Sequence, residues 1–153
     1  MSEICPICRI VAGDVKSWVV YENQHIICFF PRMFDCFGHT IIASKEHYPD
    51  LFTVPEAVLV EATKAAQQLA LHYQKVIGAK GLFLRHSSGA TKPEYVYQRP
   101  TYHFHLHLLP QFEDEVLNNL TAFDTIEEPD REELIQLLRL EEKNPSCEVS
   151  SYV

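Results

Sequence analysis

Three histidines alternate with apolar residues in the segment His103-Phe104-His105-Leu106-His107. In a β-strand, side chains two residues apart share a face, so this spacing predicts that the three imidazoles point the same way. Imidazole is nucleophilic and titrates near neutral pH, which makes imidazole catalysis and metal binding the two chemistries to consider. A solvated strand face is the plain alternative, although other polar residues would serve it equally well.

A single catalytic metal held by all three histidines is the less favoured interpretation. Side chains at i and i+4 on one strand stand roughly 13 Å apart, from a rise of about 3.3 Å per residue. His103 and His107 therefore cannot readily bind the same ion. The spacing favours imidazole catalysis over a three-histidine metal site.

A second chemical motif, Cys5-Pro6-Ile7-Cys8, lies at the start of the chain. Its spacing is typical of half a thiolate zinc site, which needs two further ligands from elsewhere. A redox pair and a coincidence are the alternatives. A redox Cys-x-x-Cys normally opens a helix after a strand, and residues 1–4 leave no room for that strand. We expect Cys28, Cys36 and Cys147 to be structurally inert.

Composition limits the classes of protein that the chain can belong to. Its 153 residues are 46% hydrophobic and carry a net charge of -8, which argues for one globular domain and against binding a nucleic-acid polymer. The longest apolar run, 26–31, is far too short for a membrane span of roughly 20 residues, and no basic export signal precedes it. An odd count of five cysteines predicts reduced thiols, and we expect a soluble, cytoplasmic protein.

The hydrophobic pattern predicts three strands, a long helix, and two more strands. The predicted strands are 17–21, 25–30, 39–43, 82–84 and 102–109, and Pro110 is expected to end the last. Thr53 and Glu56 predict a capping box at the start of the helix, and Gly78 and Gly81 its stop.

A shorter amphipathic helix is predicted at 130–142, with Leu134, Leu137 and Leu138 on one side. The βββ-α-ββ order with short early connections predicts an α+β fold, an antiparallel sheet of about five strands with the two helices packed on it. We expect a single domain over 1–142 and a polar tail over 143–153.

The histidine segment resembles the His-x-His-x-His-x-x signature of the histidine-triad (HIT) superfamily. Other segments follow in that superfamily's order, namely the Cys5-x-x-Cys8 pair, residues 17–22, Gly38-His39-Thr40 and Lys45-Glu46-His47. The cysteine pair is similar to the zinc-bearing bacterial branch. The resemblance covers roughly residues 5–110 and implies a HIT-like fold, a homodimer and a nucleotide substrate.

The resemblance implies that His105 attacks the α-phosphorus of a nucleoside phosphoramidate, a nucleotide ester or a dinucleoside polyphosphate. A covalent nucleotidyl-histidine would then pass its nucleotide to water or to another acceptor. His107 would contact phosphate or help to protonate the leaving group. His39 is expected only to satisfy backbone hydrogen bonds near the site.

In the zinc-bearing branch, a structural zinc is held by residues that correspond here to Cys5, Cys8, His47 and His103. Such a closed Cys2His2 site would join the N-terminal segment to the catalytic strand and leave His105 free.

Two departures from the family pattern affect substrate recognition. Pro31 stands where adenosine-preferring members often carry an Asp for the ribose, and Gln98-Arg99-Pro100-Thr101 replaces the usual Gly-Gln-Ser or Gly-Gln-Thr. We therefore expect Arg99, Thr101 and Lys92 to be the candidates for binding phosphate. A non-catalytic, zinc-stabilised nucleotide-binding or interaction module is the alternative function.

Overall fold

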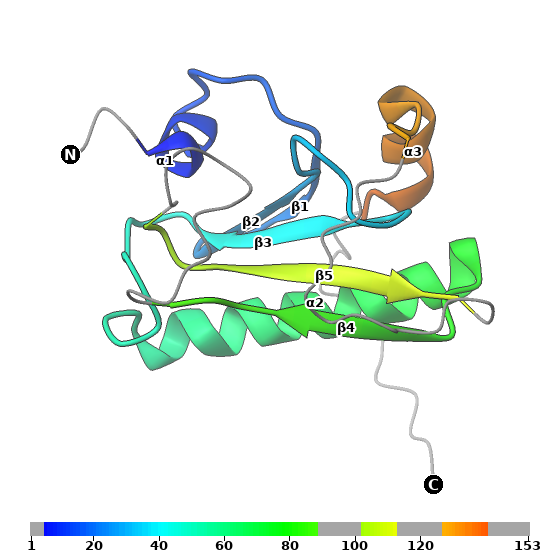
Figure 1. Cartoon of the computed structure of the whole chain (residues 1–153). Helices are drawn as coiled ribbons and strands as arrows, with labels where there is room; N and C mark the ends of the chain where they lie inside the picture. The colour runs from blue at the N-terminus through cyan, green and yellow to red at the C-terminus, as the bar shows by residue number, and fades with distance from the viewer. Residues whose placement is uncertain (1–4, 89–101, 113–126, 141–153) are drawn as a thin grey trace, which may run out of the picture.

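A five-stranded antiparallel sheet forms the centre of the computed structural model, which describes residues 5–88, 102–112 and 127–140 (Figure 1). Its strands lie in the order β1-β2-β3-β5-β4. They are β1 (Val19–Glu22), β2 (Ile26–Phe29), β3 (Thr40–Ser44), β4 (Gly81–Arg85) and β5 (His105–Gln111). This sheet and its helices are the predicted HIT-like α+β fold.

The long helix α2 (Glu56–Ile77) lies along one face of the sheet (Figure 1). Its buried positions recur at helical spacing and form the main core with the sheet. They are Val58, Ala62, Ala65, Ala66, Leu69 and Tyr73. The C-terminal helix α3 (Arg131–Leu138) adds Leu134 and Leu138 to the same core, whereas the predicted core residue Leu137 is 42% exposed.

A short helix, α1 (Pro6–Val11), stands over the opposite face of the sheet (Figure 1). A second apolar cluster lies between them and contains Ile7 of α1 with Ile27, Phe29, Ile41 and Ala43 of the sheet. No helix was predicted here from the sequence. Cys5 is its N-cap, and its sulfur accepts a 3.5 Å hydrogen bond from the Cys8 amide.

The prediction that Thr53 and Glu56 form a capping box at the start of α2 is wrong. Pro55 is the N-cap and offers no side-chain hydrogen bond to the helix. The Thr53 hydroxyl instead donates to Asp50, whose carboxylate also accepts from the Thr53 amide. A local turn at Asp50 takes the place of the predicted capping box. At the other end, Gly78 adopts φ 69° and stops the helix as predicted.

Strand β5 is shifted along the chain from its predicted bounds. It begins at His105, so His103 precedes the strand, and it continues through Pro110, which pairs with Leu82 of β4. A proline is tolerated there because the ladder to β3 ends at Leu108, so Pro110 has a paired strand on one side only.

Gly38 allows the chain to enter β3 close to three other elements. Its φ is +80°, and an added Cβ would come within 3.2 Å of side chains on α2 and β5 and 3.7 Å of one on α3. The left-handed backbone and the close approach both favour glycine. This tight entry fixes where the following residue, His39, places its ring.

Candidate active site and metal centre

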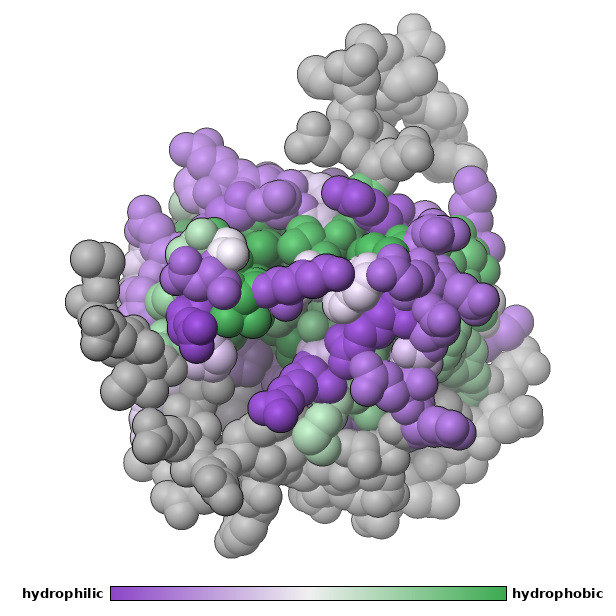
Figure 2. Space-filling model, turned by 90° about the horizontal axis from the view of Figure 1, so that it is seen from above, coloured by the Kyte–Doolittle hydropathy of each residue, from purple (hydrophilic) through white to green (hydrophobic). Residues whose placement is uncertain are grey.

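His105 and His107 lie on the face of the sheet opposite α2. Their cross-strand partners on β3, Ala43 and Ile41, belong to the apolar cluster beneath α1, whereas the intervening Leu106 packs against the main core. The centroids of the two imidazole rings are 5.1 Å apart. Seen from above in Figure 2, the molecule shows hydrophilic residues around an apolar area.

The backbone fixes which nitrogen of His105 carries the proton. Nδ1 lies 2.6 Å from the carbonyl oxygen of His103, and a carbonyl can only accept. Nδ1 therefore donates, and the lone pair of the neutral ring is on Nε2. The carbonyl oxygen of His105 itself lies 2.7 Å from Nδ1 of His86, which follows β4. This contact holds the same stretch of backbone.

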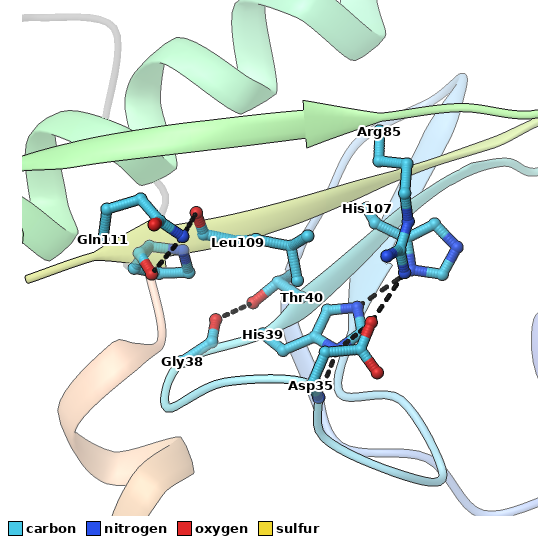
Figure 3. Close-up of polar contacts among 9 residues, drawn as sticks. Asp35, Gly38, His39, Thr40, Arg85, His107, Leu109 and Gln111 are labelled. Carbon is cyan, nitrogen blue, oxygen red and sulfur yellow. Dashed lines mark hydrogen bonds and ion pairs between the residues drawn. The ribbon is translucent and has the colours of Figure 1, made fainter. Parts of the chain in front are cut away.

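A chain of hydrogen bonds fixes the tautomer of His107 (Figure 3). The Asp35 amide donates to Nδ1 of His39 over 3.1 Å, which leaves the proton of that ring on Nε2. His39 Nε2 then donates over 2.9 Å to His107 Nδ1. The proton of His107 is therefore on Nε2, where it can be donated. His39 accepts the backbone bond predicted for it and, beyond that prediction, orients His107.

Both imidazoles of this hydrogen-bonded pair, His39 and His107, are held in the neutral form. Burial lowers the pKa of His39 to about 4, against a smaller opposing effect of the Asp35 carboxylate. Burial also lowers the pKa of His107 to about 2, with further contributions from the neighbouring His105, His39 and Arg85. Hydrogen bonds, and not charge, therefore orient these two imidazoles at neutral pH.

Arg85 and Asp35 complete the polar group on this face, and the sequence analysis identified neither. Arg85 Nη2 lies 2.6 Å from Asp35 Oδ2 (Figure 3). Asp35, His39 and His107 offer ligand atoms within 4.8 Å of one another. The carboxylate already binds a guanidinium, and the two imidazoles bind each other, so this group has the chemistry of a hydrogen-bonded network. Asp35 lies in a loop and Arg85 in the edge strand. Their proximity could therefore have been predicted only from the strand register, which the sequence does not give.

A separate cluster joins the N-terminus of α1 to the segment after β3, which holds His47, and to the segment before β5, which holds His103. The ligand atoms of Cys5, Cys8, His47 and His103 all lie within 4.8 Å of one another. His103 Nδ1 lies 3.3 Å from Cys5 Sγ and 3.5 Å from Cys8 Sγ, and His47 Nδ1 lies 3.2 Å from Cys8 Sγ. Edges of a tetrahedral zinc site with two sulfur and two nitrogen ligands measure about 3.3–3.8 Å.

The hydrogen bonding of His103 suits a metal ligand. Its Nε2 lies 2.7 Å from the Ser44 carbonyl oxygen and must donate to it, so the lone pair is on Nδ1 and faces the thiols. The Nδ1 atoms of His47 and His103 are 3.2 Å apart, a spacing that a shared cation would explain. Burial, followed by the hydrogen bond and charge of Cys5, raises the pKa of Cys8 to about 11, so a metal would have to displace a proton there.

The remaining predicted site residues, Lys92, Arg99 and Thr101, lie outside the described residues. Pro31 is buried at the end of β2, and its carbonyl accepts a 2.9 Å hydrogen bond from Arg131 of α3. The same guanidinium donates to the Arg32 carbonyl over 2.9 Å. At the position where the family often has a ribose-binding Asp, this chain thus has a backbone turn held by its C-terminal helix.

Known proteins share both the sequence pattern and the fold. The HIT domain family model matches residues 12–114. An uncharacterized HIT-like protein of Mycoplasma genitalium is 31% identical over 109 residues, 71% of this chain and 74% of the relative. The adenylylsulfatase HINT3 of Arabidopsis thaliana is 25% identical over 113 residues, 74% of this chain and 55% of that protein.

Among solved structures, a zinc-bound histidine triad family protein from Mycobacterium smegmatis matches with a TM-score of 0.73. It is 26% identical, and the match covers 91% of this chain and 93% of that protein. The five-stranded sheet and its histidine-bearing strand define the class of fold. With these relatives, the chain belongs to the HIT family. Each helix in the described ranges is too short or too polar to cross a membrane.

Proposed function

We propose that this chain is a nucleotide hydrolase or nucleotidyl transferase that acts at the α-phosphate through a covalent nucleotidyl-His105. Membership of the HIT family supports nucleotide chemistry in general, and one relative is an adenylylsulfatase. The observation that carries the proposal is the hydrogen bond from His105 Nδ1 to the His103 carbonyl, because it puts the lone pair of the neutral ring on Nε2, the nitrogen that would attack.

The reaction divides into two substitutions at phosphorus. In the first, the Nε2 lone pair of His105 forms an N–P bond while the bond from phosphorus to the leaving group breaks and its electron pair departs with that group. In the second, the oxygen of water or of an acceptor attacks, the N–P bond breaks, and the electron pair returns to Nε2. The proton of the attacking hydroxyl is released, so the protein is regenerated.

His107 supports both steps as a neutral donor. Its Nε2–H can bond to a phosphate oxygen or to the departing atom, on the same face as His105. His39 keeps this tautomer in place by occupying Nδ1. Lys92, Arg99 and Thr101 are proposed to bind further phosphate oxygens.

The proposal includes a structural zinc held by Cys5, Cys8, His47 and His103. The donor set and its spacing fit this metal, and a related protein of known structure is zinc-bound. When bound, zinc would supply cross-linking and no catalysis, because protein ligands close its coordination shell. The His103 carbonyl accepts the hydrogen bond from His105 Nδ1, and the His103 ring would be a zinc ligand. The metal would therefore also fix the carbonyl that orients the nucleophile.

We further propose a homodimer formed through α2 and the edge strand β4. Apolar side chains remain exposed along these elements, with Leu71 62%, Leu82 39% and Leu84 42% exposed. Sedimentation equilibrium tests this proposal, and a monomer at micromolar concentration would contradict it.

The decisive experiment is intact-mass spectrometry of protein incubated with a panel of nucleotide substrates and quenched within milliseconds to seconds. We expect a mass increase that corresponds to one covalently bound nucleoside monophosphate, mapped to His105 by peptide sequencing. The increase should be absent from a His105→Ala variant with normal zinc content. Nucleotide binding without adduct or turnover for every substrate would overturn the proposal and favour a non-catalytic module.

A further inference from the structure

Arg85 occupies a position directly beside the proposed catalytic histidines. In the antiparallel ladder between β4 and β5 it is the partner of His107, so the two side chains share a face of the sheet. His105 points from the same face two residues earlier along β5. The side chain of Arg85 is 19% exposed, which leaves it reachable from solvent.

The loop between β2 and β3 holds this arginine in place. Asp35, from that loop, lies 2.6 Å from Arg85 Nη2, and its side chain is 18% exposed. Figure 3 shows the guanidinium reaching from β4 across His107 to meet Asp35. A guanidinium has five N–H donors in a rigid plane, and this geometry suits phosphate or sulfate oxygens as well as a carboxylate.

Arg85 supplies positive charge that the neighbouring imidazoles do not. His39 and His107 are neutral at pH 7 because burial lowers the pKa of both. A fixed cation stabilises a group that gains negative charge as a bond breaks, and it does so most strongly at a partly buried site. It offers no such benefit to a leaving group that departs as a neutral amine.

We propose that Arg85 stabilises the negative charge of the leaving group and that the preferred substrates are therefore acid anhydrides and not phosphoramidates. In these anhydrides, the α-phosphate is joined through oxygen to a second phosphate or to a sulfate. This inference rests on the proposed function. As His105 Nε2 bonds to phosphorus, the P–O bond to the leaving group breaks and both electrons stay on the bridging oxygen. The anion forms without taking up a proton. In a phosphoramidate, the departing nitrogen must take up a proton.

The test compares kcat/KM for adenosine 5′-phosphosulfate, diadenosine triphosphate and adenosine 5′-phosphoramidate, with the guanosine equivalents run in parallel. The variants are R85Q, R85K and D35N, with K75Q as a charge-matched control on α2. R85Q and D35N both break the Arg85–Asp35 ion pair, but only R85Q removes the cation. Melting curves and zinc content are measured for each variant.

For R85Q we expect a loss of about 100-fold in kcat/KM on the anhydrides and less than about threefold on the phosphoramidate. R85K should regain part of the loss, and K75Q should match the wild type. D35N keeps the cation but removes the carboxylate that positions it, so its loss on the anhydrides should be smaller than that of R85Q. A larger effect on the sulfate or on the triphosphate shows which anion Arg85 receives. Equal losses on all substrates in R85Q would overturn the inference while the proposed function stands. A wild type without turnover or adduct on every substrate would instead overturn the proposed function itself.

Discussion

His103 and His105 are two residues apart and yet are prepared for different chemistry. Nε2 of His103 donates to the Ser44 carbonyl, which turns Nδ1 toward the thiols of Cys5 and Cys8. Nδ1 of His105 donates to the His103 carbonyl, which puts the lone pair on Nε2, the nitrogen proposed to attack phosphorus. In both residues the role follows from which ring nitrogen meets a backbone carbonyl, because that bond selects the tautomer.

The two sites also differ in the groups that surround them. The thiol and imidazole cluster joins segments far apart in the chain and suits a closed metal site. Around His105 and His107 lie neutral imidazoles, a guanidinium and a carboxylate. A cation suits the first set of groups and a phosphate the second.

The largest effect is expected on the catalytic side, from removal of the nucleophile. His105→Gly should lower turnover by about 10⁴-fold or more while zinc content stays unchanged. Steady-state kinetics and metal analysis on the same preparation measure both. Free imidazole added to this variant should restore part of the turnover, since it can replace the missing ring. Turnover within about tenfold of the wild type would show that His105 is not the nucleophile.

On the metal side, loss of a ligand should reduce stability before it reduces chemistry. Cys5→Ser should lower zinc content and destabilise the fold by about 3 kcal/mol or more, which is about 10 °C in melting temperature. Differential scanning calorimetry with and without a chelator measures this. Cys28→Ser, a buried cysteine outside the cluster, is the control for thiol loss, and it should keep its zinc. A chelator that leaves the wild-type melting curve unchanged would contradict the structural role.

Acid should weaken the catalytic side through His39. Its pKa is 6.5 for an ordinary exposed imidazole and about 4 in the folded protein, so between these pH values the unfolded chain binds a proton that the folded chain does not. Stability is therefore fully present above pH 6.5 and is lost as the pH falls toward 4, by about 3 kcal/mol at most.

Urea unfolding at pH 7 and pH 5 measures this loss in the wild type and in His39→Gln. The wild type should lose about 2 kcal/mol more than the variant over this interval. Acid release of zinc affects both proteins, so it cancels in the comparison. Parallel pH dependence in the two proteins would show that His39 is not held neutral by the fold.

The smallest effect is expected at Ser44, whose hydroxyl lies 3.1 Å from His103 Nε2 while its carbonyl lies at 2.7 Å. If the carbonyl fixes the tautomer, Ser44→Ala should change zinc affinity by less than about threefold and cost about 1 kcal/mol of stability. Competition with a chromogenic chelator measures the affinity. A tenfold weaker zinc affinity would assign the orientation of His103 to the hydroxyl instead.

Much of the fold follows from local patterns in the sequence. The hydrophobic pattern predicted all five described strands, and helical periodicity with Gly78 predicted α2 and its end. The errors occurred where tertiary contacts outweigh local preference. Pro110 stays within β5 because its unpaired side lies beyond the end of β3, and Thr53 bonds to Asp50 because the turn before α2 uses its hydroxyl.

The sequence by itself determined which chemistry was available, since residue type and spacing marked the alternating histidines and the paired cysteines. The family resemblance also indicated the four residues of the metal cluster. Only the tertiary structure decided the tautomers of His103 and His105 and the grouping of Asp35, Arg85 and His39 around His107. The physical reason is that the tautomer of each histidine depends on which backbone carbonyl lies nearest to its ring. The Arg85–Asp35 ion pair depends on the strand register that places Arg85 beside His107. Neither is encoded in the spacing of residues along the chain.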